Sequence, residues 1–332
     1  MAPGPASYTW VMNLASSESA PRSIEVAQAE AGQRLDRFLS GRLGASRTQI
    51  RRLLARGGVV QGGRPLGLGD KGAPVKRGDQ LEISDFRPPE QRRILAEPDV
   101  ALDVLAEGPG WLAVDKPSGV PVHPLEEGET GSLLSAVAAR YPALHGVGEA
   151  GLRSGVVHRL DVDTSGVVLV ATSQASWQRL RAAFAEHRVL KVYRAVVRGR
   201  VTRAQSLRLG LRVAQHRPAR VRVVPVAQAE ADPAVWAAEL ALRPLEPLNG
   251  ATLVEVVPRT GFLHQIRASL AHLGHPLLGD RRYGARTVDG GDGDPMVAPR
   301  HLLHAARLRF EEIEASSPDP EDFRRALTAL RS

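Results

Sequence analysis

The feature that most constrains the fold is the alternation of strand-like and helix-like runs after the first hundred residues. Short apolar runs of single-strand length cover 111–114, 167–171, 192–197 and 252–257. Apolar residues recur at helical spacing over 133–141, 175–184, 264–273 and 320–330. Because a sheet must bury its apolar face against other elements, this mixture predicts an α+β domain built around a sheet with flanking helices.

A smaller unit is expected ahead of that domain, at residues 23–85. Within it, Ser46 is a favourable helix N-cap, and Gln49 completes a capping box three residues on. Ile50, Leu53 and Leu54 share one face of the predicted helix. The remaining positions carry four arginines: Arg47, Arg51, Arg52 and Arg56. They form either a solvated helix face or an RNA-binding surface, since arginine contacts phosphate through paired hydrogen bonds.

Composition sets the other boundaries. Residues 1–22 are rich in Ala, Pro and Ser without periodicity, which predicts a flexible tail. Residues 86–95 are polar and contain proline, as linkers do. The second domain therefore spans 96–332, with a turn-rich surface loop at 287–298.

The charge balance and the residue types limit the class of protein. The net charge of +8 suits a polyanion such as nucleic acid or an anionic membrane, although a genome rich in Arg codons produces the same surplus. The absence of cysteine excludes disulfides, thiolate metal sites and cysteine nucleophiles. The N-terminus lacks a basic signal-peptide region, and no run approaches the ~20 apolar residues of a membrane span. We expect a cytoplasmic chain, monomeric and without an obligate protein partner.

The densest group of chemically active side chains is HRLDVDTSG at 158–166, directly before the apolar run VVLVATS. Three interpretations of this segment are possible. His158, Asp161 and Asp163 could ligate a divalent metal. Alternatively, the Asp, Thr and Ser side chains could satisfy an ordinary turn. In the third reading the loop is catalytic, with a carboxylate beside an arginine doing nucleophilic or acid–base work. The residue types alone leave all three open.

Three further segments carry polar groups in suggestive places. In the predicted helix after Thr260-Gly261, the apolar stripe leaves Arg267 free to point into a cleft. Tyr193 lies in a predicted strand directly after Lys191-Val192, and Lys116 follows another strand. Each feature alone is weak, because a lone Tyr in a strand is usually a core residue and a lone Arg is usually solvated.

Taken in order, these segments resemble the RluA-type family of RNA pseudouridine synthases. The matching pieces are DKPSGVPVHP (115–124), HRLDVDTSG (158–166), KVYRAVVRG (191–199), HQIR (264–267), GHPLLGDRRYG (274–284) and LHAARLRF (303–310). The resemblance covers about 96–330 and implies a mixed, largely antiparallel sheet in the catalytic domain. Residues 24–83 resemble, more loosely, the small α/β S4-type RNA-binding domain.

The resemblance also implies roles for individual residues. Asp161 would be the catalytic aspartate, attacking a flipped-out uridine in ribosomal or transfer RNA at the ribose C1′ or the base C6. Tyr193 would stack on the base and could also take part in removing the C5 proton. Arg267 would pair with Asp161, and Arg159 would fill the space that the base vacates. Substrate contacts are expected from Arg159, His158, Thr164, Lys116 and His264. No cofactor or metal is expected, because the reaction only rearranges the substrate.

The sequence departs from the family pattern close to the expected site. Phe262 and Leu263 stand where an Arg and a polar residue are usual, and Ser269 stands where a His is common. A rival hypothesis is therefore an RNA-binding protein, such as a ribosome-assembly factor, that has lost the chemistry. Another is a hydrolase or metal enzyme that uses His158 and Asp161.

Overall fold

The computed structural model describes residues 22–84, 86–284 and 298–331. The described chain divides into two compact units, the first ending at Leu95 and the second beginning at Ala96. Short segments at 125–129 and 150–152 belong to the first unit. The predicted tail lies outside the described residues except for Arg22, which already belongs to a strand. The predicted loop at 287–298 lies outside them up to residue 297.

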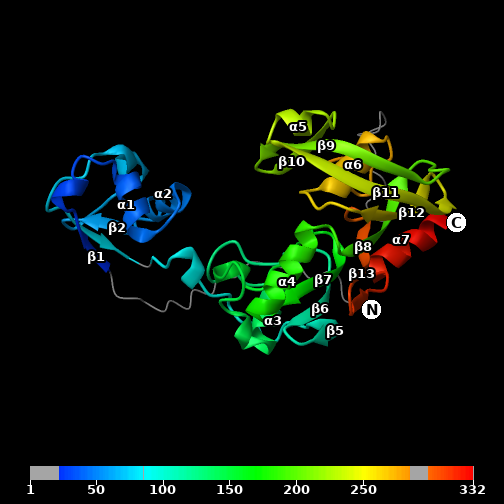
Figure 1. Ribbon diagram of the computed structural model, residues 1–332, viewed down its shortest axis with the longest axis horizontal. Helices are drawn as coiled ribbons and strands as arrows, with labels where there is room; N and C mark the ends of the chain where they lie inside the picture. The colour runs from blue at the N-terminus through cyan, green and yellow to red at the C-terminus, as the bar shows by residue number, and fades with distance from the viewer. Residues whose placement is uncertain (1–21, 85, 285–297, 332) are drawn as a thin grey trace, which may run out of the picture. The chain divides into compact units, whose positions relative to one another are not determined.

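The first unit packs two helices against a small sheet (Figure 1). Its elements are β1 (Arg22–Glu25), α1 (Leu35–Leu43), α2 (Arg47–Ala55), β2 (Val59–Gln61), β3 (Arg64–Pro65) and β4 (Gln80–Ile83). The strands pair in the order β1-β4-β2-β3. The predicted capping box is present, since Ser46 accepts from the Gln49 backbone and Gln49 reaches back to the Ser46 N–H. Ile50, Leu53 and Leu54 are buried in the core of this unit.

The second unit is built on a ten-stranded sheet. Its first half contains β5 (Asp103–Gly108), β6 (Trp111–Lys116), α3 (Leu133–Arg140), β7 (Ser165–Ala171), α4 (Gln174–Ala185) and β8 (Leu190–Arg198). Its middle contains β9 (Gln205–His216), β10 (Ala219–Val224), α5 (Gln228–Ala231), β11 (Val235–Leu248) and β12 (Ala251–Pro258). Its last part contains α6 (Gln265–His272), β13 (Leu303–Phe310), β14 (Ile313–Ser316) and α7 (Glu321–Arg331).

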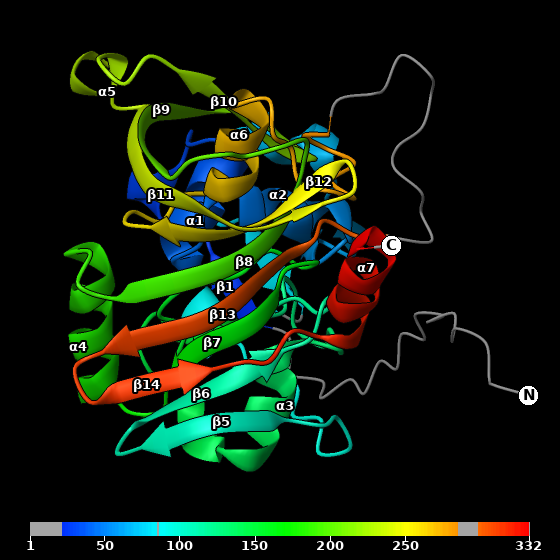
Figure 2. The ribbon, with the colours of Figure 1, turned by 90° about the vertical axis from the view of Figure 1, so that its right-hand side faces the viewer.

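The strand order is β10-β9-β11-β12-β8-β13-β7-β6-β5, with β14 paired to β13 (Figure 2). Every described pair is antiparallel except a short parallel contact between β13 and β7. The fold is therefore the expected α+β arrangement with a mixed, largely antiparallel sheet. The strands β9, β10 and β11 were not predicted, although Leu207, Leu209 and Leu211 alternate as a half-buried strand requires.

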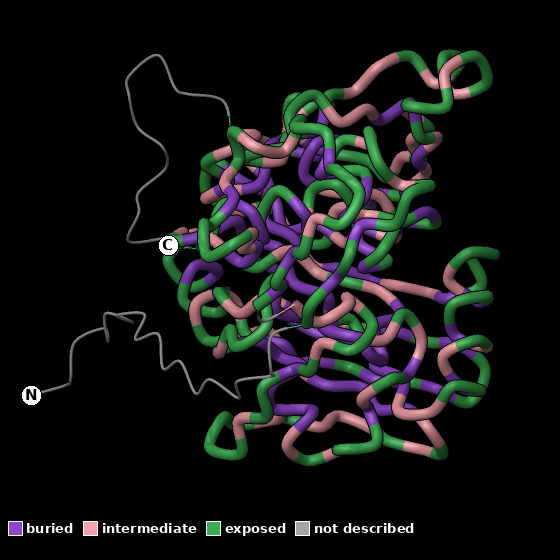
Figure 3. Tube along the Cα trace, turned by 90° about the vertical axis from the view of Figure 1, so that its left-hand side faces the viewer, coloured by how far each residue is buried: buried purple, intermediate pink, exposed green. Residues whose placement is uncertain are grey.

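Helices pack on both faces of the sheet. Buried residues gather in the inner parts of the trace and exposed residues in its outer loops (Figure 3). On β8, Tyr193 and Ala195 face the core that α6 completes with Ile266 and Leu270. The next residue along β8, Val196, faces the opposite core, where α7 contributes Phe323 and Leu327. None of the helices in the described part of the chain is long and apolar enough to cross a membrane.

Candidate active site

Asp161 lies on the loop that leads into β7, and its side chain is 24% exposed. A backbone hydrogen bond from Thr164 N–H to the Asp161 carbonyl closes the turn. On the far side of the loop, the Val162 carbonyl accepts from both the Lys116 ammonium and the Gly119 backbone N–H. The loop is thus fixed at its ends, while the Asp161 carboxylate remains accessible to solvent.

Arg267 joins Asp161 to a second, buried carboxylate. Its guanidinium donates to Asp161 Oδ2 at 2.8 Å and, through two other nitrogens, to Asp280 at 2.7 and 2.8 Å. The Asp280 side chain is 0% exposed and also accepts the backbone N–H groups of Arg282 and Tyr283. Burial acts to raise the pKa of Asp280, but its hydrogen bonds to Arg267 prevail and hold the pKa below its usual value. Arg267 is therefore held rigidly and presents a cation to Asp161.

His264 and Tyr283 form the next side of the site. His264 Nε2 lies 3.9 Å from Asp161 Oδ2, and Nδ1 lies 2.9 Å from the Tyr283 hydroxyl oxygen. That hydroxyl accepts the Val221 backbone N–H, and the Arg267 guanidinium lies over the Tyr283 ring. Burial, partly offset by the Asp161 charge, lowers the pKa of His264, so the imidazole is neutral at pH 7.

Tyr193 lies on β8, buried among Ile266, Leu303 and other apolar side chains. Burial raises the pKa of its phenol, and the negative charge of Asp161 raises it further. The phenol is consequently protonated at neutral pH.

A buried polar network supports the Asp161 loop from behind. Arg300 donates to the carbonyl of Asp163, to Ser165 Oγ and, through two nitrogens, to Asp322 on α7. Thr164 Oγ1 lies 2.8 Å from His301 Nε2. Burial, with the nearby Arg267 charge, lowers the pKa of His301 to about 4, so this ring is neutral. Arg300 and Asp322 therefore connect the loop to the C-terminal helix.

The predicted site residues separate into two groups. Asp161, Arg267 and His264 come together, with Tyr193 close enough for its pKa to respond to Asp161. Arg159 is exposed next to them on the same loop. Thr164 is buried, and its hydroxyl is used by His301.

Lys116 and His158 were predicted to contact the substrate, and in the structure polar atoms of both side chains bond within the chain. Lys116 is 0% exposed and donates to the carbonyls of Pro117, Val120 and Val162. His158 Nε2 accepts the Leu169 backbone N–H, and its ring stacks on Phe184. Both residues position the loop. No group of three or more His, Asp or Glu side chains that could hold a metal ion occurs among the described residues.

Sequence reasoning missed Asp280, Tyr283, Arg300 and His301. Asp280 and Tyr283 belong to the quoted segment GHPLLGDRRYG, which was matched only as a motif. Asp280 lies thirteen positions after Arg267, and neither helical nor strand periodicity predicts that residues at this separation lie side by side. Arg300 and His301 directly precede the segment LHAARLRF. The signals available in the sequence were the Asp directly after a Gly, at Asp280, and the polar pair Arg300-His301 before a strand.

A cavity of about 640 Å³ opens beside this group. Its lining is strongly basic and consists of Arg220, Arg267, Arg281, Arg282 and Arg300, together with the single carboxylate of Asp163 and the neutral groups Gln215, Pro218, Gly279, Pro299 and His301. Arg267 and Arg300 are committed to carboxylates, as described above. Arg220 and Arg281 are exposed, and neither has an ion-pair partner among the described residues. The cavity therefore offers a cationic wall next to Asp161.

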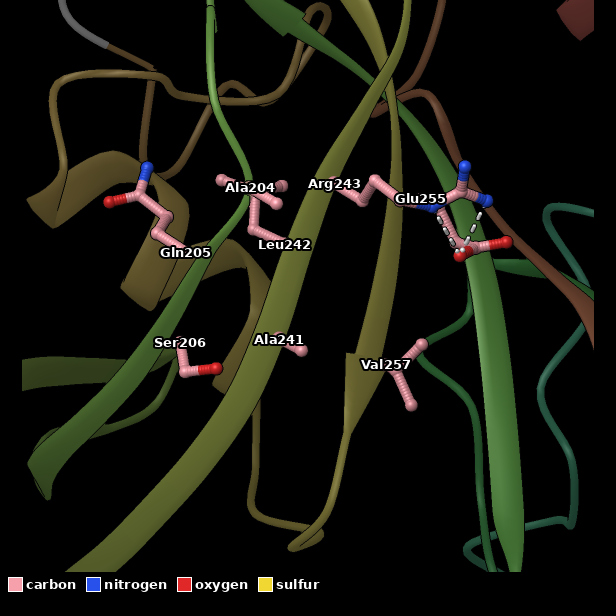
Figure 4. A pocket seen from close by; sticks show the side chains of 8 residues that line it. All are labelled: Ala204, Gln205, Ser206, Ala241, Leu242, Arg243, Glu255 and Val257. Atoms are coloured by element: carbon pink, nitrogen blue, oxygen red, sulfur yellow. Dashed lines mark hydrogen bonds and ion pairs between the residues drawn. The ribbon is translucent and has the colours of Figure 1, made fainter.

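A second cavity, of about 420 Å³, lies on β9, β11 and β12 and contains none of the predicted site residues (Figure 4). Its charged groups, Arg243 and Glu255, bond to each other at 3.0 Å. This pairing leaves the second cavity without a free charge, so it is not the candidate site.

Comparisons with known proteins identify the family to which the chain belongs. The profile described as RNA pseudouridylate synthase matches residues 110–272. An uncharacterized RNA pseudouridine synthase of Chlorobaculum parvum is 31% identical over 93% of this chain and 98% of its own length. The ribosomal large subunit pseudouridine synthase D of Neisseria meningitidis is 31% identical over 91% of this chain and 79% of its own length. The solved structure of human RNA pseudouridylate synthase domain containing 1 aligns with a TM-score of 0.52 and 26% identity, covering 66% of this chain and 84% of that one.

The match over nearly the full length of relatives above 30% identity establishes the family. The matched profile includes Asp161, Tyr193, His264 and Arg267. This chain belongs to the RluA-type family of RNA pseudouridine synthases and is an enzyme that isomerises uridine in RNA.

Proposed function

We propose that this enzyme acts on specific uridines in structured ribosomal or transfer RNA, with Asp161 as its nucleophile and a flipped-out base as its substrate. The observation that carries the proposal is the partly exposed Asp161 carboxylate held at 2.8 Å by Arg267. An attacking carboxylate must be ionised and aimed, and a rigid guanidinium favours both. A uridine within paired RNA hides its reacting atoms, so it must leave the stack at a cost of a few kcal/mol.

The reaction replaces the C1′–N1 bond with a C1′–C5 bond. If Asp161 attacks C1′, the C1′–N1 bond breaks and uracil leaves with the electron pair. The freed base turns, C5 bonds to C1′, and the carboxylate departs. If Asp161 adds to C6 instead, the C1′–N1 bond breaks and the base turns while attached to the enzyme; C5 then bonds to C1′, and the carboxylate leaves C6. In both routes the C5 proton is lost and N1 gains a proton, so the product is an isomer of the substrate.

The surroundings of Asp161 support separate roles for three neighbours. Tyr193 has a raised pKa, and a protonated phenol is a poor base. This favours base stacking by its ring over removal of the C5 proton. Arg159 is exposed on the Asp161 loop, in reach of RNA, which suits a residue that fills the space left by the flipped base. His264, neutral and close to Asp161, is suited to contact the uracil or ribose by hydrogen bonding.

The basic cavity supports an RNA backbone as the bulk of the substrate. Arg220, Arg281 and Arg282 line it beside Arg267, and guanidinium groups bind phosphate oxygens through paired donors. Phosphate contacts of this kind position an RNA without reading its sequence. Binding should therefore weaken as salt rises.

The first unit supports a second RNA contact. Arg47, Arg51, Arg52 and Arg56 are exposed on α2 or at its end, while the apolar residues of the same helix are buried. We infer that this unit is the S4-type RNA-binding domain suggested by its sequence. In this proposal the enzyme works in the cytoplasm as a monomer, without a cofactor.

Mapping of pseudouridine in cellular RNA tests the proposal. Carbodiimide adducts followed by primer extension would be compared between wild-type and deletion strains of the source organism. We expect stops in ribosomal or transfer RNA that disappear in the deletion strain and return with the wild-type gene, but not with Asp161→Ala. An identical map in both strains would overturn the assignment to these RNAs.

A further inference from the structure

An exposed tryptophan stands on the sheet face that carries the active site. Trp236 on β11 is 49% exposed, although a large aromatic side chain usually is buried in a soluble domain. Its ring stacks on Phe262, with centroids 5.7 Å apart and planes inclined by 21°. The other described tryptophans differ, because Trp111 is 7% exposed and Trp177 is partly buried with its indole N–H bonded to the Val156 carbonyl.

The pair is continuous with the catalytic group. Alternate side chains of a strand point to the same face. Trp236 on β11 therefore points to the same face as Ala238 and Leu240, which is the α6 side of the sheet. Phe262 packs in the cluster that contains Ala268 of α6, Val221 of β10 and Tyr283. Tyr283 in turn bonds to His264, which lies 3.9 Å from Asp161. Trp236 is thus linked to Asp161 through Phe262, the cluster that Phe262 shares with Tyr283, and His264.

We propose that the Trp236–Phe262 pair is a stacking platform for one unpaired base of the RNA, close to the target uridine in the folded substrate. The proposal rests on the proposed function and names a recognition element of that site. Phe262 stands where the family pattern leads one to expect an arginine, so this enzyme offers an aromatic surface in place of a charge.

An RNA base fits this surface better than an apolar protein partner does. A flat indole supported from below by a second ring leaves one π-face open, and sequence-tolerant stacking on such faces is how proteins hold unpaired bases. The cavity lined by Arg220 and Arg282 is connected to this cluster, because Tyr283 accepts from the Val221 backbone N–H and Arg282 donates to the Ala219 carbonyl on the same strand. Phosphate-binding cations and the aromatic pair are therefore carried by the same elements of the fold, which suits a nucleotide strand.

Tryptophan fluorescence tests the platform directly. The emission of Trp236 is obtained as the difference between the wild-type enzyme and Trp236→Phe, which removes the contribution of the other tryptophans. The probes are a ten-nucleotide oligouridylate and an abasic ribose-phosphate oligomer of the same length and charge. We expect the oligouridylate to quench the Trp236 emission and the abasic oligomer to leave it unchanged. Equal quenching by both probes, or by neither, would overturn the proposal.

Kinetics provide the second arm, with RNA from the deletion strain as the substrate. Trp236→Ala should raise KM by about 5- to 150-fold, the range that corresponds to the loss of one base–aromatic stack, and leave kcat nearly unchanged. Trp236→Phe should recover most of the loss. Leu245→Ala, which removes another exposed apolar side chain from β11, is the matched control and should not alter KM.

The two experiments give different results when the stacking platform is absent and when the proposed function is wrong. An active wild-type enzyme with an unaltered KM in Trp236→Ala would overturn the platform and leave the enzyme assignment standing. A wild-type protein that makes no pseudouridine, yet shows base-dependent quenching of Trp236, would overturn the proposed function and leave the platform standing.

Discussion

Replacement of Asp280 by Asn tests whether the buried carboxylate holds the catalytic pair together. The substitution preserves shape and removes one charge. Asp280 Oδ1 accepts from Arg267 and from two backbone N–H groups, and Oδ2 accepts from Arg267 Nε at 2.7 Å. In the variant, the single amide oxygen can accept either the hydrogen bonds now made to Oδ1 or the one now made to Oδ2, but not both sets. Its NH2 group then faces the Arg267 Nε–H, donor against donor.

The structure sets the size of the effect. Removing one partner of a buried ion pair costs about 3–5 kcal/mol, because the other charge remains buried. Arg267 keeps its bond to Asp161, so the lower end, about 3 kcal/mol, applies. For a unit of this size that loss lowers Tm by roughly 6–12 °C. Arg267 also loses the support that aims it at Asp161, and a misplacement of about 1 Å reduces kcat by about a hundredfold.

Thermal unfolding followed by circular dichroism measures the first effect, and pseudouridine formation under saturating RNA measures the second. Glu321→Gln is the control, because it neutralises a carboxylate that is 72% exposed and pairs with Arg325 on the surface. It should change stability by no more than about 0.5 kcal/mol. If Asp280→Asn unfolds at the temperature of this control with kcat intact, the buried pair does not organise the site.

Three further predictions concern other parts of the chain. Gly166→Ala should prevent stable folding of the second unit, measured as loss of the cooperative thermal transition, because φ is +112° and a Cβ would lie 2.2 Å from the Ala305 carbonyl oxygen. Stability should fall as pH drops from about 6.5 towards 4: the pKa of buried His301 is about 4, below that of an unfolded histidine, so the unfolded chain binds the additional proton. His301→Gln should flatten this part of the curve of Tm against pH, and an unchanged curve would exclude His301 as its cause. Charge reversal at Arg47, Arg51 and Arg56 should weaken RNA binding and reduce its salt dependence while kcat at saturating RNA persists; an unchanged salt slope would remove α2 from the RNA-binding surface.

Local signals in the sequence were sufficient for much of the fold. The capping box at Ser46 and Gln49 marks the start of α2, because the side chains that satisfy the free N–H groups are three positions apart. Apolar periodicity predicts the helix that became α6 and the strand that became β7. The strands β9 and β11 were missed although their alternation is visible, because polar residues interrupt the apolar ones and neither strand forms a continuous apolar run.

The site was predictable only in part. The association of Asp161 with Arg267 came from resemblance to a family, since 106 positions separate the two residues. The burial of Lys116 was not predicted, because nothing in the sequence shows that three backbone carbonyls surround its ammonium group. Asp280 and Arg300 act through long-range contacts that no local pattern encodes.

The most direct test of the central claim separates chemistry from binding at Asp161. RNA from the deletion strain would be labelled with tritium at C5 of uridine, since that hydrogen is released when C5 bonds to the ribose. Asp161→Asn and Asp161→Ala should release no tritium above background, while both bind the RNA with the affinity of the wild-type enzyme. Tritium release by either variant at a substantial fraction of the wild-type rate would contradict the assignment of Asp161 as the nucleophile.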